Sequence, residues 1–304
     1  MAEAAGTESG ALLILSSACA APLIQRENAF AGILCGNLKE AGMKIDENVL
    51  QIADALSALD STMAVVLGGS RSLGLSDADS DWDLYVYQES EASDERRREL
   101  LQPFVSRAEI GNRFWETEDD CLMRSGVPLD IIYRGVKDTE ESLIRTVVKG
   151  APSSGYTTCI WHNILHSQIL SDPSGWFGEL QMHYHVPYPE ELRKNIISHN
   201  RVLLSGSIAS YDRQIEKAEK RNDIVSINHR VAAFLASYFD IIFAMNRMTH
   251  PGEKRLLPYC IRNCPALPDK FGDNIASLTG SSSGRAETVS EMVRLLDEAL
   301  VRSL

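Results

Sequence analysis

Short apolar runs and alternating polar positions predict β-strands in the first half of the chain. Residues 63–67 form an apolar run that is bounded by glycine, which is typical of a buried strand. Polar and apolar positions alternate over residues 81–87, so Asp81 and Asp83 share one face of a second strand. A further apolar run, residues 127–133, predicts another strand.

Helical periodicity surrounds these strands and dominates the second half. Helices are predicted over residues 24–41, 47–59, 138–148, 158–170, 189–208, 223–245 and 283–304. The Gly-, Pro- and Ser-rich segment 150–155 is the best candidate for a linker. We therefore expect an α+β protein in three parts: a flexible tail over 1–20, a domain with strands over 21–150 and a helical domain over 151–304.

The composition is that of an acidic globular chain, and it argues against some partners. The 304 residues carry a net charge of −12 and are 44% hydrophobic, an ordinary balance for a globular protein. A nucleic-acid-binding protein needs a basic face, so the charge argues against DNA as a partner. An acidic cleft would attract a cationic small substrate, although acidity for solubility explains most of the charge.

The cysteines and the hydropathy predict a cytoplasmic protein without a membrane partner. None of the six cysteines forms a Cys-x-x-Cys pair, and Cys260 and Cys264 have no second ligand pair at zinc spacing. We interpret them as free thiols in a reducing cytosol. No apolar run approaches the ~18 residues of a transmembrane helix, and acidic residues precede the apolar stretch 11–21, unlike in a signal peptide.

The turn between the first two strands combines glycine and serine with two acids. Gly69 lets the backbone approach a ligand, and the Ser70 hydroxyl and nearby N–H groups can hold phosphate oxygens. Asp81 and Asp83 lie roughly 6–7 Å apart along a strand and offer the oxygen ligands that suit Mg²⁺. Two such ions can stabilise the entering and leaving oxygens of a phosphoryl displacement.

A third acid is predicted to join this pair from a neighbouring strand. Asp130 is the single carboxylate in the apolar run 128–133, and such an acid is costly unless it is paired or bound to metal. An acidic cluster over residues 116–120 precedes it. The sequence thus predicts a magnesium site, with two ions, formed by Asp81, Asp83 and Asp130.

Gly69-Ser70, a gap of ten residues, Asp81-x-Asp83 and the later Asp130 together resemble the signature of the DNA polymerase β-like nucleotidyltransferase superfamily. The stretch looks most like the small-molecule branch, which includes the aminoglycoside and lincosamide nucleotidyltransferases. The resemblance covers about a quarter of the chain. It implies an N-terminal nucleotidyltransferase domain, a mixed sheet with helices, followed by a C-terminal helical bundle that helps to hold the acceptor.

The resemblance also implies an activity. A nucleoside monophosphate, AMP from ATP being the first choice, would pass to a hydroxyl of a small acceptor such as an antibiotic, and pyrophosphate would be released. Asp130 would ligate metal or accept the proton of the acceptor. Glu116 and Glu179 are the candidates for a separate general base.

The nucleotide contacts implied by the resemblance come from both ends of the chain. Gly69 and Ser70 would hold the triphosphate. Members of this branch often carry a lysine after a late bundle helix, where it meets the phosphates. Lys254 is the candidate here, followed by Arg255 and Arg71.

Two other functions remain open at this stage. One is a macromolecule-directed, toxin-like nucleotidyltransferase that acts on a protein or a tRNA, although a tRNA-directed enzyme should show a basic stripe. The other is a non-catalytic domain that binds nucleotide as a sensor or scaffold. The presence of all three acids counts against the loss of the active site.

Overall fold

The computed structural model describes residues 45–72, 80–281 and 283–303, all of which belong to one compact unit. The predicted tail over 1–20 and the predicted helix over 24–41 lie outside the described residues.

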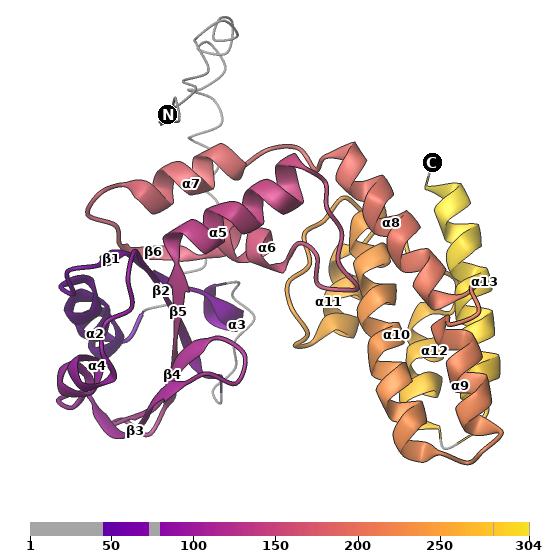
Figure 1. The fold of residues 1–304 in the computed structure, drawn as a ribbon, viewed down its shortest axis with the longest axis horizontal. Coiled ribbons are helices and arrows are strands. Elements are labelled where there is room, and N and C mark those ends of the chain that lie inside the picture. The colour runs from indigo at the N-terminus through magenta and orange to yellow at the C-terminus, as the bar shows by residue number, and fades with distance from the viewer. Residues whose placement is uncertain (1–44, 73–79, 282, 304) are drawn as a thin grey trace, which may run out of the picture. The chain divides into compact units, whose positions relative to one another are not determined.

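The described strands form a mixed sheet of six strands in the order β3-β4-β5-β2-β1-β6 (Figure 1). Strands β2 and β5 are parallel, whereas the other neighbouring pairs are antiparallel. The strands are β1 (Thr62–Leu67), β2 (Trp82–Gln88), β3 (Val105–Asn112), β4 (Thr117–Met123), β5 (Pro128–Gly135) and β6 (Gln168–Ser171). The strands predicted over 63–67, from residue 81 and over 127–133 are therefore confirmed by β1, β2 and β5.

Helices precede, interrupt and follow the sheet. The first group comprises α2 (Glu47–Ser57), α3 (Gly69–Ser72), α4 (Asp94–Leu101), α5 (Val136–Leu143) and the π-helix η1 (Ile144–Val148). The second group comprises α6 (Cys159–His166), α7 (Trp176–Tyr184), α8 (Glu190–Leu204), α9 (Tyr211–Glu219), α10 (Ile224–Met245), α11 (Leu256–Asn263), α12 (Phe271–Gly280) and α13 (Arg285–Arg302). The fold class is thus α+β, with a mixed sheet followed by a helical region, as predicted.

Three predicted elements differ in the structure. The helix expected over 158–170 ends at His166, because Ser167 is extended and the next four residues pair with β1 as the edge strand β6. The helix expected over 138–148 begins at Val136 and ends in a π-turn. The glycine turn continues into the single helical turn α3.

Two hydrophobic cores hold these layers. One joins β1 and β2 to helices α5–α8 through side chains such as Tyr87, Trp161 and Phe177. The other lies among helices α8–α13, which pack around the long helix α10 (Figure 1). Asp223 caps α10, as predicted, because its carboxylate accepts a hydrogen bond from the backbone N–H of Ser226 at 3.0 Å.

The segment proposed as a linker, residues 150–155, is tied by hydrogen bonds to α8, and Thr157, just beyond it, is tied to α10. Asn195 and Asn200 of α8 donate to the carbonyl oxygens of Gly150 and Ser153 at 2.9 and 3.0 Å. The Asp240 carboxylate of α10 accepts from the N–H and the hydroxyl of Thr157 at 3.1 and 2.6 Å. Strand β6 follows this segment and yet belongs to the sheet. The boundary at residue 150 stays a prediction.

Candidate functional site

The register of the sheet aligns three carboxylates across three adjacent strands. Asp83 of β2 lies directly opposite Asp130 of the parallel strand β5. Asp130 in turn lies opposite Asp120 of the antiparallel strand β4. Residues that are directly opposite in a sheet point to the same face. The three acids therefore form a row on one face, which they share with Asp81, two positions before Asp83.

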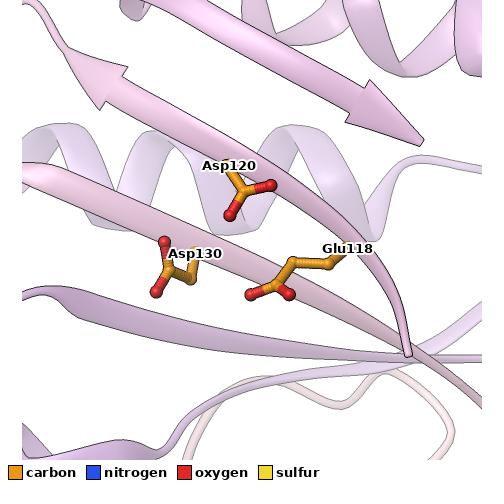
Figure 2. A group of neighbouring side chains, drawn as sticks. All are labelled: Glu118, Asp120 and Asp130. Atoms are coloured by element: carbon orange, nitrogen blue, oxygen red, sulfur yellow. The ribbon is translucent and has the colours of Figure 1, made fainter. Parts of the chain in front are cut away.

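Glu118 extends this acidic row, because it lies two positions before Asp120 on β4 and faces the same side. Carboxylate oxygens of Glu118, Asp120 and Asp130 all lie within 4.8 Å of one another, and Figure 2 shows the three groups converging. Glu118 and Asp120 were not among the predicted ligands. The signal in the sequence was the acidic cluster over residues 116–120, which contains both of them.

Burial and mutual repulsion make it costly to charge this row. Burial raises the pKa of Asp83, and neighbouring Asp81 raises it further, while Lys254 and Arg71 oppose the shift. Burial also raises the pKa of Asp130 to about 7, with additional repulsion from Asp83 and Glu118. Several hard oxygen donors that repel one another are a suitable set for a divalent cation such as Mg²⁺. Of the predicted ligands, Asp130 belongs to the converging group with Glu118 and Asp120, whereas Asp81 and Asp83 line the neighbouring cavity. The assignment of Asp81, Asp83 and Asp130 to one magnesium site stays a prediction.

Gly68 and Gly69 allow α3 to pack directly against β2. A Cβ atom on Gly69 would lie 1.7 Å from Oδ2 of Asp83, and φ at Gly69 is +63°. A Cβ atom on Gly68 would lie 2.2 Å from the Tyr85 ring. The N–H of Gly68 donates to the carbonyl oxygen of Asp83 at 2.9 Å. Only glycine fits this close approach, which helps to hold the Asp83 carboxylate in position.

Arg71 braces the chain where it enters β2. Its Nε donates to the carbonyl oxygen of Asp81 at 2.9 Å, and its guanidinium group also bonds to the carbonyl of Ser80. The same group lies 4.2 Å above the ring of Trp82. Ser70 lies in α3, and its side chain is outside the part of the chain that the structure describes.

A cavity of about 550 Å³ brings together residues from distant parts of the sequence. Gly69, Asp81 and Asp83 line it together with Lys254 and Arg255, which precede α11. One side of helix α6 completes the wall. One cavity is thus lined by two groups of residues more than 160 positions apart in sequence: the acids Asp81 and Asp83, and the basic pair Lys254 and Arg255.

Four of the described candidate residues are not among those that line this cavity: Asp130, Glu116, Glu179 and Arg71. Asp130 is connected to it through the adjacent Asp83. Glu116 accepts two hydrogen bonds, at 2.8 and 2.9 Å, from the guanidinium of Arg134. Burial opposes ionisation of Glu116, but these bonds outweigh it and lower the pKa, which makes the carboxylate a poor base. Glu179 is exposed on α7.

Comparisons with known proteins found a family match and several solved structures. The profile of the family described as "Domain of unknown function (DUF4037)" matches residues 158–256, a third of the chain. A search of curated proteins returned no match. In the described residues no helix combines the length and the apolar character needed to cross a bilayer.

The solved structures share little sequence with this chain. A nucleotidyltransferase-like protein from Exiguobacterium sibiricum 255-15 is 11% identical, with 84% of this chain and 75% of that chain covered and a TM-score of 0.42. An aminoglycoside 6-adenyltransferase from Bacillus subtilis is 10% identical, with 86% and 92% covered and a TM-score of 0.29. The CCA-adding enzyme from Thermotoga maritima, complexed with tRNA, is 13% identical, with 88% and 81% covered and a TM-score of 0.31.

Proposed function

We propose that this protein is a magnesium-dependent nucleotidyltransferase that moves a nucleoside monophosphate, AMP from ATP, to a hydroxyl of a small cationic acceptor. One observation carries the proposal: the cavity is lined by the carboxylates Asp81 and Asp83, a glycine packed against Asp83 and the basic pair Lys254 and Arg255. Carboxylates suit Mg²⁺, and lysine and arginine suit phosphate oxygens.

The residues would divide the reaction between them. Asp81, Asp83 and Asp130 would hold Mg²⁺, which when bound would withdraw charge from the transferred phosphoryl group. Lys254 and Arg255 would offset the charge of the β- and γ-phosphates. The hydroxyl oxygen of the acceptor would form a bond to the α-phosphorus, the bond from the α-phosphorus to pyrophosphate would break, and the proton of the hydroxyl would pass to water.

The acidic face supports an acceptor that carries positive charge. Glu118 and Asp120 extend the row of acids beyond the predicted ligands. Amino groups on an acceptor would be attracted to such a field. An aminoglycoside has both the amino groups and the hydroxyls that the proposal requires, so a panel of aminoglycosides is the appropriate first set of acceptors.

Pyrophosphate release tests the proposal. Wild-type protein with ATP, Mg²⁺ and the aminoglycoside panel should release pyrophosphate, and Asp83→Asn should lower the rate by about 10²-fold or more. Asp54→Asn is the matched control, because Asp54 is exposed on α2 and does not line the cavity. Equal rates for wild type and Asp83→Asn would refute the assignment of the site. Failure of the wild type to bind ATP with Mg²⁺ in calorimetry would refute the proposed function altogether.

A further inference from the structure

Helix α6 presents a continuous polar stripe to the cavity. Cys159, His162, Asn163 and His166 recur at helical spacing, and all of them line the cavity. The other side of the helix carries apolar residues such as Trp161, which is buried in the core beneath the sheet. Sequence analysis predicted a helix here but assigned none of these residues to the site.

The stripe carries no charge at neutral pH. Burial raises the pKa of Cys159 to about 12 and lowers the pKa of His162 to about 3. Burial also lowers the pKa of His166. The cavity therefore has a charged part, with Asp83 and Lys254, and an uncharged polar part along α6.

The imidazole rings of the stripe offer defined hydrogen-bonding groups. Nδ1 of His166 lies 2.8 Å from the carbonyl oxygen of His162, and since a carbonyl only accepts, Nδ1 carries the proton. Nε2 of His166 is therefore an acceptor. The two rings are stacked, with centroids 4.0 Å apart. Nε2 of His162 is buried and has no hydrogen-bond partner among the described residues. The partly buried Asn163 lines the cavity beside these two histidines.

A nucleoside triphosphate has the same division into a charged and an uncharged part. Its phosphates match the part of the cavity with Lys254, and its base is flat, neutral and rich in hydrogen-bonding groups. We propose, building on the proposed function, that the polar stripe of α6 binds the base of the nucleotide and selects adenine through Asn163 and His166.

The selection of adenine follows from the donors and acceptors on each side. The Asn163 amide offers one donor and one acceptor, which match N7 and the N6 amino group of adenine. Nε2 of His166 can accept a hydrogen bond from the same amino group. Guanine has two acceptors, N7 and O6, at these positions, so it leaves the Asn163 carbonyl and His166 without donors.

Binding measurements separate the base from the phosphates without any acceptor. Calorimetry with Mg²⁺ should show that wild-type protein binds ATP more tightly than GTP and more tightly than inorganic tripolyphosphate, which has no base. The variant Asn163→Ala/His166→Ala should bind ATP about tenfold more weakly. Its affinity for tripolyphosphate should not change, and this unchanged value also shows that the variant is folded.

Two controls make the result decisive. His183→Ala makes the same change at an exposed histidine on α7 that does not line the cavity, and it should bind ATP as the wild type does. His166→Ala alone should give part of the loss, since His166 belongs to neither hydrophobic core and its replacement leaves both intact. Equal ATP affinity in the double variant and the wild type would overturn the base site but leave the proposed function standing. Absence of both ATP and tripolyphosphate binding in the wild type would overturn both.

Discussion

Asp83 and Asp130 lie directly opposite each other on the parallel strands β2 and β5, and both carboxyl groups are largely shielded from solvent. Like charges in directly opposite positions destabilise a sheet. The pKa of each group is raised, by burial first and by neighbouring carboxylates second, with Lys254 opposing the shift at Asp83. A bound cation would attract both carboxylates. Without a cation, their mutual repulsion lowers the stability of the fold, and binding of a metal would restore it.

The first prediction concerns this strain at Asp130. The pKa of Asp130 is raised to about 7, so its contribution to stability is lost as the pH rises through that value. Without metal at pH 8, the melting temperature of Asp130→Asn should lie a few degrees above that of the wild type, which corresponds to a stabilisation on the order of 1–2 kcal/mol. Mg²⁺ should raise the melting temperature of the wild type more than that of the variant. Thermal melts with and without Mg²⁺ measure this, and an equal response to Mg²⁺ would contradict it.

The second prediction compares two glycines with positive φ. Gly69→Ala would force a Cβ atom against the Asp83 carboxylate, whereas Gly126, with φ of +86°, has nothing within 4 Å of such an atom. Both substitutions cost roughly 1–2 kcal/mol of backbone strain. Only Gly69→Ala should also lower pyrophosphate release, by about 10²-fold, since a displaced carboxylate no longer fits the site. Similar activities of the two variants, measured at matched folded fractions, would contradict the close-packing argument.

The third prediction concerns Lys254, an exposed residue that lines the cavity and lowers the pKa of Asp83 against the larger effect of burial. Lys254→Ala should weaken binding of ATP with Mg²⁺ roughly ten- to hundredfold, the range for hydrogen bonds to charged groups. Unfolding without nucleotide should change by less than about 0.5 kcal/mol. Lys137→Ala, on the exposed face of α5, is the matched control. Unchanged affinity in calorimetry would contradict this role for Lys254 and make Arg255 the candidate for the phosphate contact.

The fourth prediction concerns the pH dependence of stability at Asp240. Burial raises the pKa of this carboxyl to about 6 from 3.8, even though Thr157 and Asn200 donate hydrogen bonds to it. The folded protein therefore holds this proton more tightly than the unfolded chain, and the resulting stability is lost as the pH rises through about 6.

Asp240→Asn removes this titration. Whatever the substitution costs in hydrogen bonds, the free energy of unfolding of the variant, relative to that of the wild type, should rise by on the order of 1 kcal/mol from pH 5 to pH 7.5. Urea denaturation at the two pH values measures the difference. Asp54→Asn, at an exposed carboxylate, should show no such gain. A constant difference between Asp240→Asn and the wild type would disprove the raised pKa.

The sequence predicted the elements whose pattern is local. Asp81 and Asp83 could be assigned to one face because strand periodicity is two, and α10 could be delimited because Asp223 caps a long, mainly apolar helical stretch. Strand β6 could not be predicted, since its four residues continue the apolar pattern of α6 and acquire their conformation by pairing with β1.

The site was predictable only in part for a similar reason. Asp120 joins the acidic row through its register with β5, and nothing in its immediate sequence specifies that partner. A general-base role for Glu116 would need a carboxylate without a strong partner, but Glu116 accepts hydrogen bonds from Arg134. This contact could not be predicted, because Arg134 lies 18 residues away in sequence. The polar stripe of α6 is visible in the sequence, but its position beside Lys254 depends on how the helices pack.

Strand β5 has a consequence for how the protein is made. It lies between β2 and β4 in the sheet, yet it follows both of them in the chain. During synthesis, which proceeds from the N-terminus, β2 and β4 each expose an unpaired edge until residues 128–135 leave the ribosome. The same event brings Asp130 between Asp83 and Asp120. A nascent chain that stalls before this point would have two unpaired strand edges and an incomplete acidic row. Once β5 emerges, it joins the β1–β2 and β3–β4 pairs and completes the acidic row in a single step.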